Sequence, residues 1–129
     1  MNTKLLFTII LLCLTTTIFG QVYSYKAFKY ANIFEQMTSD GKSHLMVRDA
    51  DSSNDLVDID MNDGVVYISG GQEFRIIRNF KKGLSTVFHC AGKITLVLYK
   101  GKEITLDIQY PYESLNTRTI IRYYLKNND

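Results

Sequence analysis

The chain has 129 residues, of which 46% are hydrophobic and 22% charged, and its formal net charge is +2 at pH 7. A chain of this length builds one domain with a sizeable core. A charge so close to neutral gives no electrostatic reason to expect binding to nucleic acid or to an anionic membrane surface.

The first 20 residues are typical of a secretory signal peptide. Lys4 precedes an uncharged apolar run over residues 5–14, and the hydropathy then falls towards Gly20. A run this short cannot span a bilayer, which needs about 20 residues. We therefore expect cleavage after Gly20, a single β domain over residues 21–129 and an exported protein, periplasmic or secreted, without a membrane span in its mature form.

Cysteine usage follows from this cleavage. Cys13 lies in the segment that we expect to be removed, so Cys90 remains as a single thiol without an internal partner. The alternation around it turns Cys90 inward beside Phe88, where it acts as a small buried hydrophobe. His89 points to the opposite side, so the two neighbours cannot form a base–nucleophile pair.

The mature chain alternates apolar and polar residues with a period of two, which is typical of half-buried strands. The first strand is expected over residues 22–34. Its aromatic residues change parity between Tyr25 and Phe28, which predicts a bulge near Ala27. A short second strand is expected over residues 45–48.

Four turns between residues 57 and 106 predict a strand register. Loops are expected at 63–64, where Asp-Gly favours a two-residue hairpin, and at 70–72, 91–93 and 100–102. Across these loops, the apolar residues face one another in the pairs Ile59–Ile68, Ile68–Phe74, Cys90–Ile94 and Leu98–Ile104. The match between turns and apolar pattern assigns one face of these strands to the core.

Two further strands are expected over residues 104–110 and 119–125, and no segment shows the periodicity of an amphipathic helix. About eight sequential strands joined by tight loops predict an all-β fold. The expected architecture is a single antiparallel meander that closes as a barrel or folds as a sandwich.

An acidic stretch over residues 49–60 resembles an EF-hand calcium loop. Its oxygen-bearing side chains stand at ligand-like spacing: Asp49, Asp51, Ser53, Asp55 and Asp60. Asn54 replaces the turn-making Gly, and no helices flank the stretch. The hypothesis of a Ca²⁺-stabilised surface module therefore stands beside a simpler interpretation, in which residues 49–55 form a solvated loop.

Polar and aromatic side chains on the outer parity of the strands are candidates for an interface. They are Tyr67, Arg75, His89 and Tyr99. Exposed aromatic residues together with Arg often anchor protein partners. The same residues would also fit the outer face of a closed barrel, so both interpretations stay open.

No motif for catalysis or phosphate binding occurs, and no cofactor other than Ca²⁺ is suggested. We expect a non-enzymatic binding or interaction module with a protein partner. The alternative is a lipocalin-like carrier of a small apolar ligand. A carrier needs an interior cavity of a few hundred Å³, which a core filled by Ile59, Ile68, Leu96 and Leu106 would exclude.

Several segments are similar to small exported β-rich proteins of Bacteroidota. They are residues 18–21, 56–61, 65–68, 72–76, 87–90, 104–110 and 121–124. The resemblance implies export and a β fold, and it carries no known activity or site residues.

Overall fold

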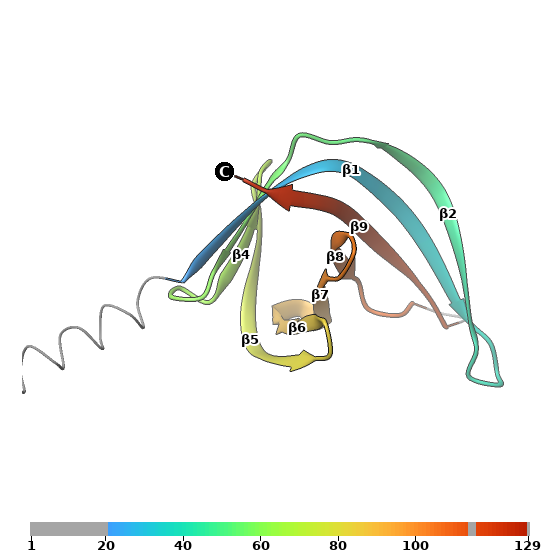
Figure 1. Ribbon diagram of the computed structural model, residues 1–129. Coiled ribbons are helices and arrows are strands. Elements are labelled where there is room, and N and C mark those ends of the chain that lie inside the picture. The colour runs from blue at the N-terminus through green and yellow to red at the C-terminus, as the bar shows by residue number, and fades with distance from the viewer. Residues whose placement is uncertain (1–20, 114–115, 129) are drawn as a thin grey trace, which may run out of the picture.

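The computed structural model describes residues 21–113 and 116–128 and shows an all-β protein (Figure 1). Its strands are β1 (Val22–Met37), β2 (Ser43–Ser52), β3 (Leu56–Asp60), β4 (Val65–Ile68), β5 (Gln72–Lys82), β6 (Ser85–Cys90), β7 (Ile94–Lys100), β8 (Ile104–Gln109) and β9 (Thr117–Asn127). Within the described ranges, no helix has the length and apolar character needed to cross a membrane. The predicted signal peptide, with Cys13 and the cleavage after Gly20, lies outside the described residues.

Strand β1 closes the sheet into a barrel. The strand order is β1-β3-β4-β5-β6-β7-β8-β9, and β9 pairs again with β1. This closure settles the choice between barrel and sandwich in favour of an eight-stranded antiparallel barrel with β2 as an extra strand. β1 can serve three neighbours because it is long. Residues 22–26 pair with β3, the later part of the same edge pairs with β2, and the other edge pairs with β9. Figure 1 shows β1, β2 and β9 as long curved strands lying side by side.

The predicted bulge in β1 is confirmed. The pairing of β1 with β9 shifts between Ala27 and Lys29. Tyr25 and Ala27 are buried in the main core, and Tyr30 packs against the same core after the shift. Phe28, the residue skipped by the pairing, is therefore turned outward and is 50% exposed.

The predicted register is confirmed at one turn and shifted by two residues at the other three. The loop 91–93 pairs Cys90 with Ile94, as expected. The observed pairs at the other turns are Ile59–Val66, Ile68–Gln72 and Leu98–Leu106. A shift of two residues keeps every side chain on its predicted face, because side chains alternate with a period of two.

The first of these turns shows why the register moved. The Asp60 carboxylate accepts hydrogen bonds from the backbone N–H groups of Asn62 (3.0 Å) and Asp63 (3.1 Å). These bonds hold a longer loop that ends on Gly64, which has a φ of +66°. Asp63 does not adopt the positive φ that the predicted two-residue turn requires.

The main core fills the middle of the barrel. Ile59, Ile68, Leu96 and Leu106 are at most 2% exposed and belong to one cluster with residues from most of the barrel strands. An eight-stranded barrel has an interior just wide enough for side chains to fill or for one small ligand. In this barrel, side chains occupy the central layer.

Strand β2 is longer than the predicted strand over 45–48 and includes residues 49–52, which were expected to form a loop. All its residues are exposed, because β1 is the one strand of the described chain that pairs with it. The pairing with β1 contains an irregularity at Arg48, whose guanidinium carbon lies 4.6 Å from the centroid of the Phe34 ring. A bulge followed by Asp49 and Asp51 is a common way to protect a free sheet edge from pairing with another chain.

A second, smaller core lies on the opposite face of β1 and β9. Ala31, Ile33 and Ile120 are buried there. Beside them, the 7%-exposed Glu35 accepts hydrogen bonds from Arg118 Nε at 2.7 Å and from the Tyr112 hydroxyl. This ion pair connects the far ends of β1 and β9 with the segment that follows β8.

Candidate functional site

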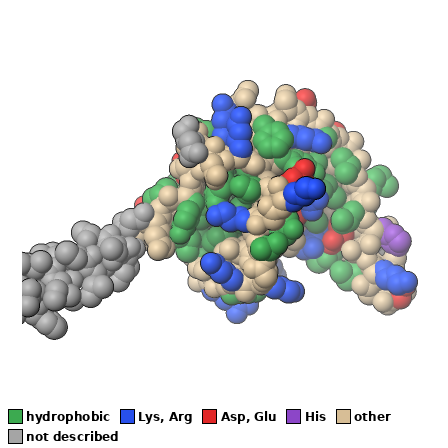
Figure 2. Space-filling model, in the orientation of Figure 1, with side chains coloured by type: hydrophobic (Ala, Val, Ile, Leu, Met, Phe, Trp, Pro, Cys, Tyr) green, Lys and Arg blue, Asp and Glu red, His purple; other side chains and the backbone are tan. Residues whose placement is uncertain are grey.

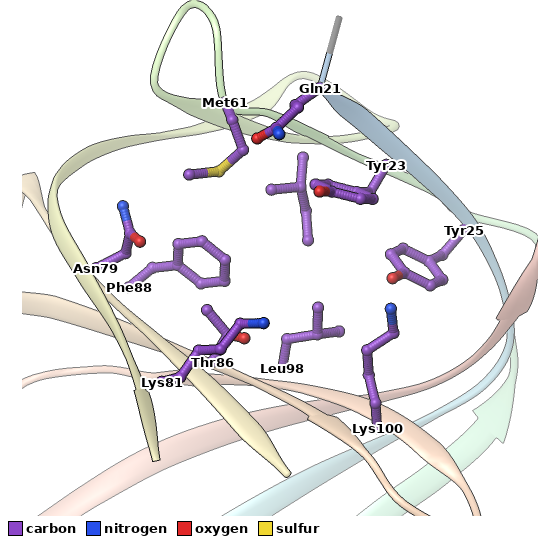
Figure 3. Close-up of a pocket in the computed structure, with 11 residues that line it drawn as sticks. Gln21, Tyr23, Tyr25, Met61, Asn79, Lys81, Thr86, Phe88, Leu98 and Lys100 are labelled. Atoms are coloured by element: carbon purple, nitrogen blue, oxygen red, sulfur yellow. The ribbon is translucent and has the colours of Figure 1, made fainter. Parts of the chain in front are cut away.

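A cavity of about 380 Å³ opens at one end of the barrel, and we call it the mouth (Figure 3). The strand ends that meet there are the start of β1, the end of β3, the end of β5, the start of β6 and the end of β7. The lining residues are Gln21, Tyr23, Tyr25, Ile59, Met61, Asn79, Lys81, Thr86, Phe88, Leu98 and Lys100. Figure 3 shows the labelled side chains arranged around an open centre.

The floor of the mouth is formed by buried side chains of the main core. Tyr25, Ile59, Phe88 and Leu98 are each at most 5% exposed, and all belong to the main core. They join the mouth to the filled central layer, so the cavity lies above the core and not within it. A small molecule entering the mouth would therefore rest on preformed, close-packed side chains.

A bulge in β5 turns Asn79 and Lys81 into the mouth. The pairing of β5 with β6 shifts between Ile76 and Arg78, which leaves Ile77 unpaired and 70% exposed. Before the shift, the inward residue is Ile76. After it, the inward parity passes to Asn79 and Lys81, which pair with Phe88 and Thr86. Without the bulge, alternation would have turned Arg78 inward instead.

Lys100 is the second positively charged residue that lines the mouth, after Lys81. Its ammonium nitrogen lies 5.9 Å from the Tyr23 ring centroid and 5.8 Å from the Tyr25 ring centroid, within the range of cation–π contacts. Within residues 21–113 and 116–128, no Asp or Glu lines the mouth. Among the described residues, the ion pairs are Arg118–Glu35 and Arg122–Asp107, so neither Lys81 nor Lys100 is neutralised by a carboxylate.

The predicted calcium ligands have other local roles in the structure. Asp49 and Asp51 lie on the exposed strand β2, whereas Asp60 ends β3 and holds the turn that follows. Asp55 accepts hydrogen bonds from the hydroxyls of Ser53 (3.3 Å) and Ser69 (3.1 Å). In the described part of the chain, no group of three or more His, Cys, Asp or Glu side chains could hold a metal ion.

The predicted interface residues lie outside the barrel on four different strands. Tyr67 is on β4, Arg75 on β5, His89 on β6 and Tyr99 on β7. No hydrogen bond, ion pair or ring contact joins any two of them. On the face shown in Figure 2, Lys and Arg side chains are spread out and do not form one patch. Tyr67 and Arg75 lie on the same outer face of the neighbouring strands β4 and β5, and the interface itself stays a prediction.

Cys90 is buried as the alternation predicts. Its side chain is 4% exposed, and its sulfur lies 3.7 Å from the Phe88 carbonyl oxygen. Burial raises the pKa of the Cys90 thiol to about 11, from an ordinary value of 9.0. The reactive thiolate is therefore strongly disfavoured in the folded protein at neutral pH.

This raised pKa predicts a loss of stability in alkali. Below pH 9, the thiol is protonated in both the folded and unfolded states. Between pH 9 and pH 11, the unfolded chain loses the proton more readily, so the free energy of unfolding should fall by about 2–3 kcal/mol from Cys90 alone. Urea unfolding of the wild type and Cys90→Ala at pH 8 and pH 11 measures this loss.

The Cys90→Ala variant should be less stable than the wild type at pH 8, by about 1 kcal/mol, because it leaves a small cavity. At pH 11 it should be at least as stable as the wild type, because it has no thiol to ionise. Equal differences between the two proteins at both pH values would contradict the assignment.

Comparisons with protein-family models, with curated proteins and with solved structures find no match to this chain. The structure shows a β-barrel compatible with a binding module, and the mouth is the site that its geometry favours. The residues that line the mouth were not predicted as a site from the sequence. One signal was present, since the adjacent apolar residues Ile76 and Ile77 interrupt the alternation just before Asn79 and Lys81.

Proposed function

We propose that the protein is a non-enzymatic binding protein that takes a small molecule with an apolar body into the mouth of its barrel. The observation that carries this proposal is the cavity of about 380 Å³ above a filled core. Its volume lies in the range of about 300–1,000 Å³ that is usual for ligand pockets.

The chemistry of the lining supports binding. The floor offers aromatic and aliphatic surfaces, and the polar groups of Gln21, Asn79 and Thr86 stand around it. A few polar groups around an apolar surface fix the orientation of a ligand whose affinity comes mainly from burial. The filled core meets the condition that excludes a ligand inside the barrel. What this proposal keeps from the carrier hypothesis is a small ligand, which sits at the open end of the barrel.

The expected export of the protein belongs to the same proposal. A barrel without a disulfide that works outside the cytoplasm depends on its core for stability, and the closed sheet with its filled central layer is suited to that. Sequencing the N-terminus of the protein recovered from its native host tests the expected start at Gln21.

The binding proposal predicts that a bulky side chain placed in the mouth weakens the binding of a small apolar molecule. Thr86 lines the mouth and pairs with Lys81 of β5 and Leu98 of β7, so Thr86→Phe should occupy the cavity with an aromatic ring. Titration with phenylnaphthylamine, an uncharged fluorescent apolar probe, should show binding to the wild type. The variant should bind this probe at least about tenfold more weakly, because the ring removes the space for it.

The matched control is Thr95→Phe, which places the same ring on the outer face of β7 opposite His89. It should bind the probe as the wild type does. Probe affinity that is unchanged by Thr86→Phe, or reduced equally by both variants, would show that the mouth is not the binding site.

A further inference from the structure

We infer that the molecule bound in the mouth is a small amphipathic anion, with its apolar body on the floor and its single acidic group at the rim between Lys81 and Lys100. This inference rests on the proposed function and names the chemical class of the ligand. It covers carboxylates, sulfates and phosphate monoesters, which share the charged head that two lysines recognise.

The two ammonium groups reach the mouth from different strands. Lys81 comes from β5 and Lys100 from β7, and in Figure 3 both side chains point towards the open centre. Lys81 is turned inward only because of the bulge at Ile77. A bulge that re-aims one charged side chain into a cavity is a local device typical of functional sites.

The charged side chains that line the mouth are all positive. Two lysines line it, no acidic residue does, and neither lysine has an ion-pair partner among the described residues. The chain over residues 21–129 has 14 basic and 13 acidic side chains, so this imbalance is a local property of the mouth. An anion placed between the two ammonium groups would meet two attractive charges and no repulsive one.

The mouth also changes in polarity with depth. Lys81 and Lys100 are exposed at the rim, whereas Tyr25, Ile59 and Phe88 are at most 2% exposed at the floor. An ion bound at the rim keeps part of its hydration, and an apolar body bound below it loses contact with water. This gradient fits a molecule with one charged end and one apolar end better than a fully apolar one.

A matched pair of fluorescent probes tests the inference. Anilinonaphthalene sulfonate has the same rings as phenylnaphthylamine and adds one sulfonate. The wild type should bind the sulfonate at least about tenfold more tightly than the neutral probe, since a charge-assisted contact is commonly worth a factor of ten or more. The preference should shrink as salt is added, because both lysines lie at the rim where ions screen them.

Single substitutions locate the charge effect. Lys81→Gln and Lys100→Gln should each weaken binding of the sulfonate by about tenfold and leave binding of phenylnaphthylamine unchanged. The control is Lys82→Gln, which removes the same charge from the next residue of β5, on the outer parity and outside the mouth. It should leave both affinities unchanged, and circular dichroism should show the same fold for all three variants.

The outcomes separate the inference from the function on which it rests. Equal affinity for the two probes, with no effect of the lysine variants, would overturn the anion while leaving the mouth as a binding site. Equal weakening by Lys81→Gln and Lys82→Gln would reduce the preference to a general charge effect and would also overturn it. Failure of both probes to bind would remove the proposed function and the inference together.

Discussion

Replacing Leu96 with Ala is expected to lower the free energy of unfolding by about 3–4 kcal/mol. Leu96 is fully buried and lies between Phe88 of β6 and Ile108 of β8 in the central layer of the barrel. Shortening such a side chain loses its transfer free energy and leaves a cavity that a closed sheet can collapse only in part. Urea unfolding followed by circular dichroism measures the change.

The control for Leu96 is its neighbour Val97, which points to the outer face of the same strand. Val97→Ala also shortens a side chain of β7 but should cost less than about 1 kcal/mol, because it removes strand preference and little buried surface. Similar losses for the two variants would mean that the central layer does not carry the stability of the barrel.

The faces of the strands could be predicted from the sequence more securely than their register. Ile59, Leu98 and their neighbours lie on the predicted inner face, yet at three turns the pairing moved by two residues. The face follows from alternation, which any shift by an even number preserves. The register depends on the turn. The turn at residues 61–64 is held by hydrogen bonds that the backbone N–H groups of Asn62 and Asp63 donate to the Asp60 carboxylate, and the apolar–polar alternation does not predict these bonds.

The two bulges also show what can and cannot be predicted from the alternation of apolar and polar residues. The bulge in β1 could be predicted because aromatic residues on both sides of Ala27 mark the change of parity. In β5 the bulge falls at Ile77, and the residues after it that change face include Arg78 and Lys81, whose charged side chains tolerate either face in a sequence pattern. The location of the mouth follows from that second bulge, so its lining could not be found by alternation alone.

The length of β2 could not be predicted because the strand has no buried face. Every residue from Ser43 to Ser52 is exposed, so no alternation is selected in this segment. Its strand structure comes from pairing with the edge of β1 beyond β3. The calcium hypothesis arose from residues 49–60, which the structure divides between the end of β2, a connection and β3. The ligand-like spacing along the sequence therefore does not become the spacing of a compact loop.

The second large effect is expected at the buried ion pair between Glu35 and Arg118. Their side chains are 9% and 17% exposed, and Arg118 Nε lies 2.7 Å from the Glu35 carboxylate. Arg118→Met should lower the free energy of unfolding by about 3 kcal/mol, because it leaves Glu35 charged and buried without its cation. Glu35→Leu should cost about 2–3 kcal/mol, because it leaves Arg118 without its anion.

The double variant, Glu35→Leu with Arg118→Met, distinguishes a charge effect from lost packing. It replaces both charges by apolar groups of similar size beside Ile33 and Ile120, and it should recover most of the loss, ending within about 1 kcal/mol of the wild type. Losses that simply add in the double variant would contradict this. Recovery would show that the pair adds little net stability compared with apolar side chains, which leaves the filled barrel core as the main source of stability beneath the mouth.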